Sequence, residues 1–304
     1  MQALKESHVL LQSGRQMPRL AFGTGTQWFK TEDGKSRKEG SELALASALH
    51  TALDAGFRHI DEAEMYGTQA HTGPALQDWL SKHPDVKRED LFITSKIWKG
   101  MTNVRETVQQ TLQSLNTPYL DLYLVHAPFL KENDIDADLH AVWKELEALK
   151  DEGLIRDLGV SNFHVSHLKD LAAHCKHKPT VNQIECHPHL LQPELMEYCK
   201  QENIVVTSYG PLTPLSQKHE PTMVVINDIA AKTGLTTGQV LLQWNLAHGT
   251  GVITTSSKAA HVEESARTLD GAKLTQEQVD AITSAAKPHR VRGFWTKIFA
   301  DLGL

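Results

Sequence analysis

Residues 120–160 decide the fold, and they read LDLYLVHAPFLKENDIDADLHAVWKELEALKDEGLIRDLGV. The stretch opens with a short apolar run, Leu120–Val125, and closes with another, Ile155–Val160. Between them, Ile135–Lys150 has apolar residues at helical spacing and is followed by Gly153, a residue type that commonly ends helices. Two short strands that are apolar on both faces and are joined by a helix are typical of a parallel sheet covered by helices.

The same alternation repeats on both sides of this unit. Further short apolar runs predict strands at Leu20–Thr24, Phe57–Ile60, Leu91–Thr94, Val181–Ile184, Ile204–Ser208 and Gly251–Thr254. Helical spacing appears in Ser41–Ala55, Thr102–Leu115, Pro193–Glu202, Thr236–Ala247 and a segment that starts near Thr275. Eight strand–helix units in 304 residues predict an α/β fold, a single (β/α)8 TIM barrel domain over residues 1–304, with a doubly wound sheet as the alternative. His8–Leu11 and Gln16–Arg19, which flank Ser13-Gly14, predict an N-terminal β-hairpin before the barrel.

Composition excludes several classes of function. The chain has 31 Lys and Arg against 37 Asp and Glu, a net charge of −6, whereas nucleic-acid-binding domains are basic. It contains no apolar stretch of about eighteen residues that could span a membrane, and its first residues lack the apolar centre of a signal peptide. Its three cysteines (Cys175, Cys186 and Cys199) are typical of a reducing compartment. We therefore expect a cytoplasmic protein, a monomer or weak dimer, without nucleic-acid or membrane partners.

Four polar residues lie at the predicted carboxyl ends of strands, where barrel enzymes place their catalytic groups. Asp61 follows one strand and Tyr66 comes five residues later, while Lys96 and His126 each end another apolar run. Each residue alone has a structural interpretation: a helix cap for Asp61, a rim aromatic for Tyr66, a solvated charge for Lys96 and a backbone hydrogen bond for His126.

The combination of these four residues predicts chemistry. A phenol has a pKa of about 10, and a nearby ammonium held by a carboxylate would lower that pKa. A neutral imidazole could polarise a carbonyl oxygen by donating a hydrogen bond to it. We therefore expect the set to protonate an oxygen while a separate cofactor supplies a hydride.

Six segments in order resemble the aldo-keto reductase family: GFRHIDEAEMYG, FITSKIW, DLYLVHAPF, GLIRDLGVSNF, VNQIECHPHL and VVTSYGPL. The resemblance runs from about Met17 to about Leu274. It implies a TIM barrel that reduces aldehydes or ketones with a nicotinamide dinucleotide, NADP(H) or NAD(H). It also assigns the family's catalytic tetrad, with a tyrosine as proton donor, to Asp61, Tyr66, Lys96 and His126.

The resemblance further implies the cofactor contacts. Gly23 and Thr24 match the loop beside the nicotinamide ribose, and Tyr209 matches the aromatic residue that stacks on the ring. The residues that we expect at the cofactor are Gly23, Thr24, Asp61, Ser161, Asn162, Gln183, Tyr209, Gly210, Leu212, Thr254, Thr255, Ser256, Ser257, Lys258 and His261. Of these residues, Ser161, Asn162 and Gln183 match those that hydrogen-bond the carboxamide of the nicotinamide. No Gly-x-Gly-x-x-Gly fingerprint is present, so this expectation depends on the resemblance.

One segment departs from the family pattern. The family usually reads Val-Ile-Pro-Lys-Ser after the last strand, with an Arg further on, and that Lys and Arg bind the extra phosphate of NADPH. Here residues 252–258 read VITTSSK, and His261 stands where the Arg is expected. Ser256, Ser257 and Lys258 together offer hydroxyl donors and a charge for a phosphate, with NADH as the alternative cofactor. The segment resembles a fungal-type branch, related to α-keto amide and conjugated polyketone reductases, which implies NADPH and α-dicarbonyl or α-keto substrates.

Aromatic residues near the predicted rim suggest an apolar pocket for a small carbonyl substrate, lined by Trp28, Phe29, Trp98, Phe129 and Trp295. The family often has Trp after the catalytic His, but this chain has Ala127, which predicts a wider pocket. We expect Phe294 or Trp295 in the tail to fold over the mouth, and Arg292 to attract an acidic or dicarbonyl substrate.

Two other functions remain open. Lys96 could be the Schiff-base nucleophile of an aldolase or lyase, or the chain could be a non-catalytic barrel that senses its cofactor. The intact tetrad argues against the second of these. The segments His174-Cys175-Lys-His177 and Cys186-His187-Pro188-His189 lack the paired spacing of a zinc site, so we expect no metal.

Overall fold

The computed structural model describes residues 7–26, 28 and 41–303. Eight parallel strands form a closed barrel in the order β10-β3-β4-β5-β6-β7-β8-β9. They are β3 (Leu20–Gly23), β4 (His59–Asp61), β5 (Phe92–Ile97), β6 (Leu120–Val125), β7 (Ile155–Ser161), β8 (Val181–Glu185), β9 (Val205–Tyr209) and β10 (Gly251–Thr254). The closed barrel confirms the predicted fold and excludes the doubly wound sheet, which would have open edges.

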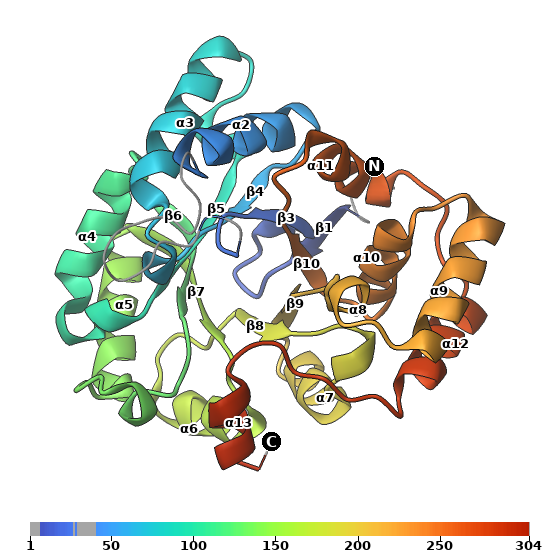
Figure 1. The fold of residues 1–304 in the computed structure, drawn as a ribbon. Coiled ribbons are helices and arrows are strands. Elements are labelled where there is room, and N and C mark those ends of the chain that lie inside the picture. The colour runs from blue at the N-terminus through green and yellow to red at the C-terminus, as the bar shows by residue number, and fades with distance from the viewer. Residues whose placement is uncertain (1–6, 27, 29–40, 304) are drawn as a thin grey trace.

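Helices surround the barrel (Figure 1). They are α2 (Ser41–Asp54), α3 (Gln69–Lys82), α4 (Val104–Ser114), α5 (Leu139–Asp151), α6 (Val165–His174), α7 (Pro193–Gln201), α8 (Thr213–Ser216), α9 (Glu220–Thr233), α10 (Thr237–Ala247), α11 (Ala259–Ala266), α12 (Gln276–Ala286) and α13 (Thr296–Asp301). Single 3-10 turns lie between them: η1 (Glu64–Tyr66), η2 (Arg88–Asp90), η3 (Lys99–Asn103), η4 (Lys131–Asn133), η5 (Pro188–Leu190) and η6 (Arg267–Leu269).

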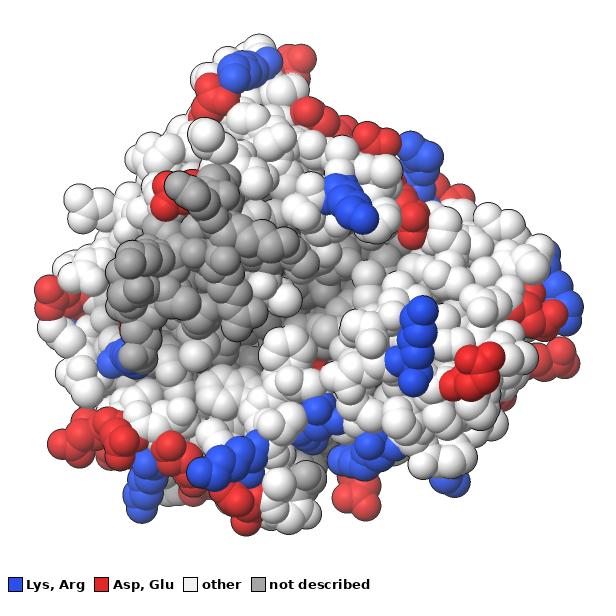
Figure 2. Space-filling view, in the orientation of Figure 1, with Lys and Arg blue, Asp and Glu red and all other residues white. Residues whose placement is uncertain are grey.

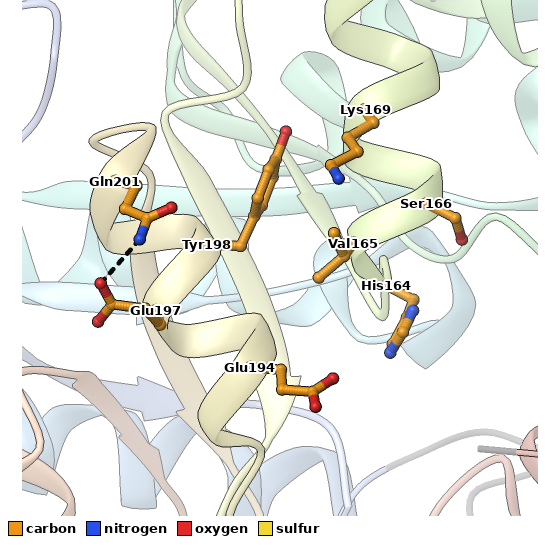
Figure 3. Close-up of a pocket in the computed structure, with 8 residues that line it drawn as sticks. All are labelled: His164, Val165, Ser166, Lys169, Glu194, Glu197, Tyr198 and Gln201. Atoms are coloured by element: carbon orange, nitrogen blue, oxygen red, sulfur yellow. Dashed lines mark hydrogen bonds between the residues drawn. The ribbon is translucent and has the colours of Figure 1, made fainter.

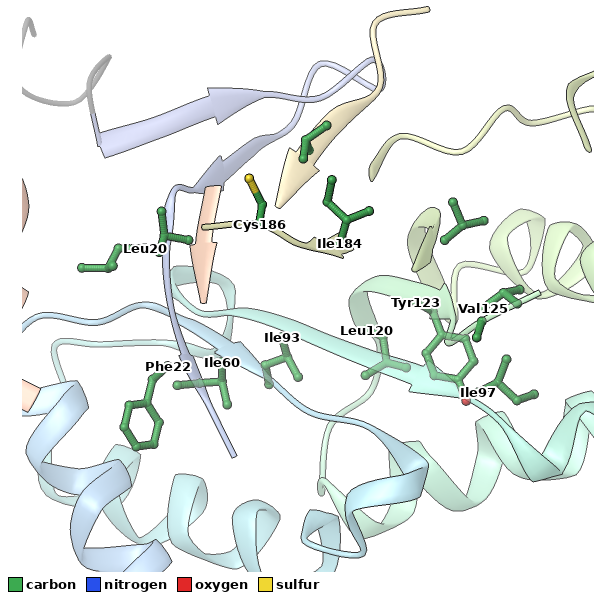
Figure 4. Close-up of a cluster of buried hydrophobic side chains, with 14 of the residues drawn as sticks. Leu20, Phe22, Ile60, Ile93, Ile97, Leu120, Tyr123, Val125, Ile184 and Cys186 are labelled. Atoms are coloured by element: carbon green, nitrogen blue, oxygen red, sulfur yellow. The ribbon is translucent and has the colours of Figure 1, made fainter. Parts of the chain in front are cut away.

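The main core fills the layer between strands and helices. Phe22, Ile60 and Tyr123, labelled in Figure 4, are strand residues of this cluster. Trp143 of α5 and Trp244 of α10 are fully buried in the same layer, and each indole N–H donates a hydrogen bond. Burial of each such apolar side chain contributes about 1.5–3 kcal/mol, and the satisfied indole nitrogens avoid the cost of a buried unpaired donor.

A two-stranded hairpin closes the amino-terminal end of the barrel. Strands β1 (His8–Leu10) and β2 (Gln16–Pro18) pair antiparallel, as the sequence predicts. The hairpin and the barrel share a second core cluster, composed of Leu11, Met17, Phe92, Leu122, Leu124 and Val181. Arg15 in the turn lies 2.6 Å from a carboxylate oxygen of Asp121 and 3.2 Å from one of Asp157. Because the hairpin covers this end, the carboxyl ends of the strands remain for a functional site.

Several element boundaries differ from the sequence predictions. Strand β4 begins at His59, and Phe57 instead packs edge-on against Phe22 with 6.0 Å between ring centroids. Strand β5 extends to Ile97, so Lys96 lies within the strand rather than after it. Helix α5 begins at Leu139 because the Asp138 side chain accepts a hydrogen bond from the backbone N–H of His140 and caps it.

Charged side chains of both signs alternate around the periphery of the face shown in Figure 2, while uncharged atoms predominate near its centre. Within residues 7–26, 28 and 41–303, no helix combines the length and the apolar character needed to cross a membrane.

Candidate active site

Lys96 is the centre of a hydrogen-bond network inside the barrel. Its side chain is fully buried. Its Nζ atom lies 2.6 Å from Oδ1 of Asp61, 2.9 Å from the backbone oxygen of Glu62 and 3.0 Å from the phenol oxygen of Tyr66. These three acceptors match the three donors of an ammonium group. Burial alone would lower the pKa of Lys96, but the charges and hydrogen bonds of Asp61 and Tyr66 raise it above its ordinary value.

Contacts on two sides of Tyr66 hold its backbone segment and its ring in place. Tyr66 ends η1, and the buried carboxylate of Glu62 accepts hydrogen bonds from the hydroxyls of Thr68 (2.9 Å) and Thr72 at the start of α3. On the other side, Gly25 approaches the ring so closely that a Cβ atom there would lie 3.0 Å from a ring carbon. The phenol therefore has a defined position relative to Lys96.

Burial raises the pKa of Tyr66, and this effect outweighs the nearby charge of Lys96, which lowers it. The sequence prediction of a lowered pKa is therefore wrong in direction. It counted the ammonium but not the cost of moving a phenolate out of water. Tyr66 consequently remains a protonated phenol at neutral pH.

His126 lies against Tyr66, with 5.8 Å between the ring centroids and an angle of 83° between the planes. Burial and, secondarily, the charge of Lys96 lower the pKa of His126 well below its ordinary value, so the imidazole is neutral. Its Nδ1 atom is buried and has no hydrogen-bond partner among the described residues. The ring therefore keeps unused hydrogen-bonding capacity beside the phenol.

The residues expected near the nicotinamide are joined to this network. Gln183 Nε2 donates to Asp61 Oδ2 over 2.8 Å, and Ser161 Oγ donates to the backbone oxygen of Gln183 over 2.9 Å. Thr24, which follows Gly23 at the end of β3, donates its backbone N–H to the backbone oxygen of Asp61 over 3.0 Å. One continuous set of hydrogen bonds thus connects the carboxyl ends of strands β3, β4, β5, β7 and β8.

Asn162 and Tyr209 extend the same set toward His126. The Tyr209 hydroxyl donates to Asn162 Oδ1 over 2.7 Å, and Asn162 Nδ2 donates to the backbone oxygen of His126 over 2.9 Å. Gly210 follows with a φ of +64°, and half-buried Leu212 begins the turn into α8. The structure therefore brings together residues at the carboxyl ends of β6, β7 and β9 that lie far apart in the sequence.

The segment expected at a phosphate follows β10. Thr254 ends the strand, and the hydroxyl of Thr255 is buried without a hydrogen-bond partner in the described part of the chain. The Lys258 backbone N–H donates to Ser256 Oγ over 3.1 Å, immediately before α11 begins at Ala259. The remaining expected residues of the segment are exposed: Ser257, Lys258 and His261. A helix start with exposed donors and one ammonium is suited to an anion.

The comparisons with known proteins agree with this geometry. Residues 19–287 match the family model described as "Aldo/keto reductase family". The chain belongs to the aldo/keto reductase family. Because members of this family reduce carbonyl groups with a nicotinamide dinucleotide, the protein is an NAD(P)H-dependent oxidoreductase.

Relatives match this reductase over almost its full length. It is 37% identical over 292 residues to the glyoxal reductase of Bacillus subtilis, covering 95% of this chain and 96% of that protein. It is 35% identical over 285 residues to the NAD/NADP-dependent indole-3-acetaldehyde reductase of Schizosaccharomyces pombe, covering 92% and 96%. Among solved structures, an aldo-keto reductase of Bombyx mori in complex with NADP superposes with a TM-score of 0.83 at 28% identity, covering 95% and 96%.

Two of the expected pocket residues of this reductase, Trp98 and Trp295, lie beside His126, and a third, Phe129, packs on Trp295. The ring centroid of Trp295 lies 6.4 Å from His126, 5.2 Å from Trp98 and 5.7 Å from Phe129. Trp295 belongs to the tail, so the expectation that the tail folds over the catalytic residues agrees with these contacts. An aromatic wall thus stands beside the imidazole.

The remaining aromatic residues predicted at the pocket have other ring contacts. The buried ring of Trp28 lies 5.9 Å from that of Phe22, and Trp28 belongs to the same main core cluster as Trp98 and Phe129. Phe29 lies outside the described residues. Phe294 meets the ring of Tyr209 edge-on, with 5.3 Å between centroids. The tail therefore contacts both a predicted catalytic residue and a predicted cofactor residue.

A group of metal-ligand residue types does occur on the surface of the reductase, but not with the partners that the sequence suggested. His177 lies 3.0 Å from Asp151 rather than beside His174. His174 instead groups with His140 and Asp170, whose ligand atoms all lie within 4.8 Å of one another. The sequence spacing did not reveal this group because its members come from two helices, α5 and α6. Both histidines already contact Asp170.

A groove of about 590 Å³ lies outside the barrel, between α6 and α7 (Figure 3). Its lining includes Lys169, Tyr198 and Glu197, and Gln201 donates a hydrogen bond to Glu197 over 2.9 Å. None of the four tetrad residues lines this groove. This groove is therefore separate from the tetrad.

Proposed function

We propose that this reductase uses NADPH to reduce small aldehydes and ketones, including α-dicarbonyl and α-keto compounds, with Tyr66 as the proton donor. The main observation in favour of this proposal is the 3.0 Å hydrogen bond from Lys96 Nζ to the Tyr66 oxygen. The same Nζ atom lies 2.6 Å from Asp61 Oδ1. Because the phenol oxygen accepts a hydrogen bond from Lys96, its own O–H is a donor for another oxygen.

The four residues have distinct roles in this proposal. A bound dinucleotide supplies the hydride that the carbonyl carbon receives. Tyr66 gives its proton to the carbonyl oxygen, so the product is an alcohol and the phenol becomes a phenolate. The Lys96 ammonium stabilises that phenolate, and Asp61 holds the ammonium charged. The neutral His126 donates a hydrogen bond that orients the carbonyl oxygen.

The residues present fit a dinucleotide. The buried and unpartnered Thr255 hydroxyl needs an acceptor or donor that the described protein does not provide. The amide groups of Asn162 and Gln183 suit a carboxamide, which requires both donors and acceptors. We propose that Ser256, Ser257 and Lys258 hold the additional phosphate of NADPH. The relative of known structure from Bombyx mori was solved with NADP, whereas the S. pombe relative is named for both cofactors.

The substrate class is supported by chemistry near the tail. Glyoxal is the smallest α-dicarbonyl compound, and one relative is named a glyoxal reductase. Arg292 is half-buried with its guanidinium 3.7 Å from the Phe299 ring, and burial lowers its pKa from the ordinary value. A partly desolvated guanidinium is suited to electron-rich oxygens such as those of a dicarbonyl or keto acid. The same substrates are implied by the resemblance to the fungal-type branch.

The aldolase alternative requires a neutral amine at Lys96. The raised pKa of Lys96, caused by Asp61 and Tyr66, keeps this group an ammonium, which is a poor nucleophile. The structure thus favours Lys96 as a stabilising charge. A cofactor-sensing barrel without catalysis would not need the tetrad to be assembled.

Substitution of Tyr66 by Phe tests the proposal. It removes the proton donor and keeps the ring that packs against Gly25 and His126. We expect kcat for glyoxal reduction, followed by NADPH absorbance, to fall by roughly 10²–10⁴-fold, the usual contribution of a general acid. The dissociation constant of NADPH should change little. Retention of more than a tenth of the wild-type kcat would refute Tyr66 as the donor.

Three broader expectations also remain proposals. We propose that residues 1–304 form one domain, that the protein is cytoplasmic and that it is a monomer or weak dimer. All three cysteines are unpaired thiols, as expected in a reducing compartment. Light scattering of the purified chain measures its mass directly and tests the oligomeric state.

A further inference from the structure

Glu185 is a buried carboxylate at the end of β8 that none of the roles above uses. Only 1% of it is exposed. Its Oε1 accepts the backbone N–H of Gly293 over 2.7 Å, and its Oε2 accepts that of Phe294 over 3.2 Å. Figure 1 shows the segment that follows α12 running along the β8 side of the barrel to reach α13. Glu185 therefore fastens this tail immediately before Trp295.

A second carboxylate, that of Glu64, binds the backbone of the loop after β5 in the same manner. Glu64 accepts the backbone N–H of Trp98 over 2.7 Å and that of Gly100 over 2.9 Å. The rings of Trp98 and Trp295 then meet at 5.2 Å, tilted by 66°. The two tryptophans beside His126 therefore each belong to a backbone segment that a carboxylate holds: Glu64 holds the segment of Trp98, and Glu185 holds that of Trp295.

The conformation of Trp295 shows that the tail depends on being held. Trp295 has a φ of +54°, in the left-handed region that costs a non-glycine residue free energy. Such a conformation persists only where the surroundings determine it. Bonds from backbone amides to a carboxylate are about twice as strong as neutral ones, and two at Glu185 act on the residues directly before Trp295.

We propose that Glu185 is a positioning residue that holds Trp295 over His126 and thereby sets the selectivity of the reductase for larger carbonyl substrates. The inference rests on the proposed function, since it concerns the same mouth. A substrate that reaches past Tyr66 and His126 packs on Trp98, Phe129 and Trp295, whereas glyoxal is too small to need them. Loss of the Glu185 bonds should therefore change KM for a large substrate and leave the chemical step intact.

The test compares glyoxal with 1-phenyl-1,2-propanedione, an α-dicarbonyl with an aromatic group. Glu185→Gln replaces one acceptor oxygen by an NH2 group that cannot accept the tail amide. We expect KM for the phenyl diketone to rise at least about five-fold, while KM for glyoxal and kcat for both change less than about two-fold. Trp295 should also become more accessible, which acrylamide quenching of tryptophan fluorescence measures without any turnover.

Glu147→Gln is a matched control. Glu147 is also buried, and its carboxylate accepts two successive backbone amides, those of Lys176 (2.6 Å) and His177 (2.7 Å). These amides precede β8 and so lie at the other end of the barrel. This substitution should lower Tm but leave the ratio of the two KM values unchanged.

Two more variants keep the inference testable if Glu185→Gln folds poorly. A Cβ atom at Gly293 would lie 3.1 Å from Glu185 Oε1, so Gly293→Ala should disturb the same contact with Glu185 intact. Trp295→Ala should raise the KM ratio by itself, and adding Glu185→Gln to it should have no further effect if Glu185 acts through Trp295.

The outcomes separate this inference from the proposed function. If the wild-type protein reduces neither probe with NADPH, the proposed function fails. If it reduces both and folded Glu185→Gln and Gly293→Ala keep the wild-type KM ratio, only the role of Glu185 fails. Additive effects of Glu185→Gln and Trp295→Ala on the KM ratio would also overturn it.

Discussion

The Nζ atom of Lys96 lies 3.0 Å from the phenol oxygen of Tyr66, and the lysine side chain has no contact with solvent. In water such a pair would be screened, and its effect on a proton transfer would be small. Inside the barrel the Lys96 ammonium would act on a Tyr66 phenolate without screening by water. If Tyr66 is the proton donor, as we propose, the pair should therefore matter most in the transition state, when the phenol loses its proton.

The pH dependence of reduction follows from these groups. Burial raises the pKa of Tyr66, and burial with the Lys96 charge lowers that of His126. Tyr66, the proposed donor, thus stays protonated, and the His126 imidazole stays neutral, across the neutral range. We expect kcat/KM for glyoxal to be flat from about pH 6.5 to 9 and to fall only near or above the ordinary phenol pKa of about 10. A titration step centred near pH 7 would contradict the neutral state assigned to His126.

We expect the preference for NADPH over NADH to depend on Lys258. This exposed residue supplies the charge of the proposed phosphate site before α11. Lys258→Ala should raise KM for NADPH about ten-fold and leave KM for NADH nearly unchanged, because only NADPH carries the additional phosphate. Lys232→Ala is a suitable control, since Lys232 is an exposed lysine paired with Asp228 on α9. Equal increases in both KM values would place Lys258 away from that phosphate.

Stability should decrease in mild acid because of a buried histidine. Burial, followed by the neighbouring His289, His187 and His219, lowers the pKa of His189 to about 4. The unfolded chain binds a proton at this residue below about pH 6.5, whereas the folded protein does not until about pH 4. The unfolded state therefore binds more protons in this window, and stability falls as pH falls, by at most about 1.4 kcal/mol per pH unit from His189.

Denaturant unfolding at pH 5, 6 and 7 measures this slope. His189→Phe removes the titrating group while keeping a ring of similar size, so the free energy of unfolding should depend less steeply on pH in the variant. His261→Phe is the control, because His261 is exposed on α11. An unchanged slope in His189→Phe would show that other groups cause the acid sensitivity.

The barrel could be predicted because its strands are apolar on both faces and regularly spaced. Helix α3 could not, because Gly73-Pro74 interrupts its pattern. The structure explains the glycine: a Cβ atom there would lie 2.1 Å from the backbone oxygen of Ser114, so only glycine allows this approach of α3 to the end of α4. From the sequence we also named no helix at α6, α8, α9, α11 or α13.

The site was predictable in part for a similar reason. The carboxyl ends of parallel strands share one rim, so Asp61, Lys96 and His126 could be placed together from their positions alone. The role of Glu185 could not be found, because its carboxylate binds backbone amides more than a hundred residues further along the chain. Such contacts leave no period or spacing in the sequence.

The hairpin at the amino end has a consequence for the order of folding. Its turn residue Arg15 contacts Asp121 on β6 and Asp157 on β7, more than a hundred residues further along the chain. Its apolar residues Leu11 and Met17 find their neighbours on β5, β6 and β8. Because contacts over such separations require large loops to close, we expect the hairpin to dock only after β5, β6, β7 and β8 have formed, although it is synthesised before them.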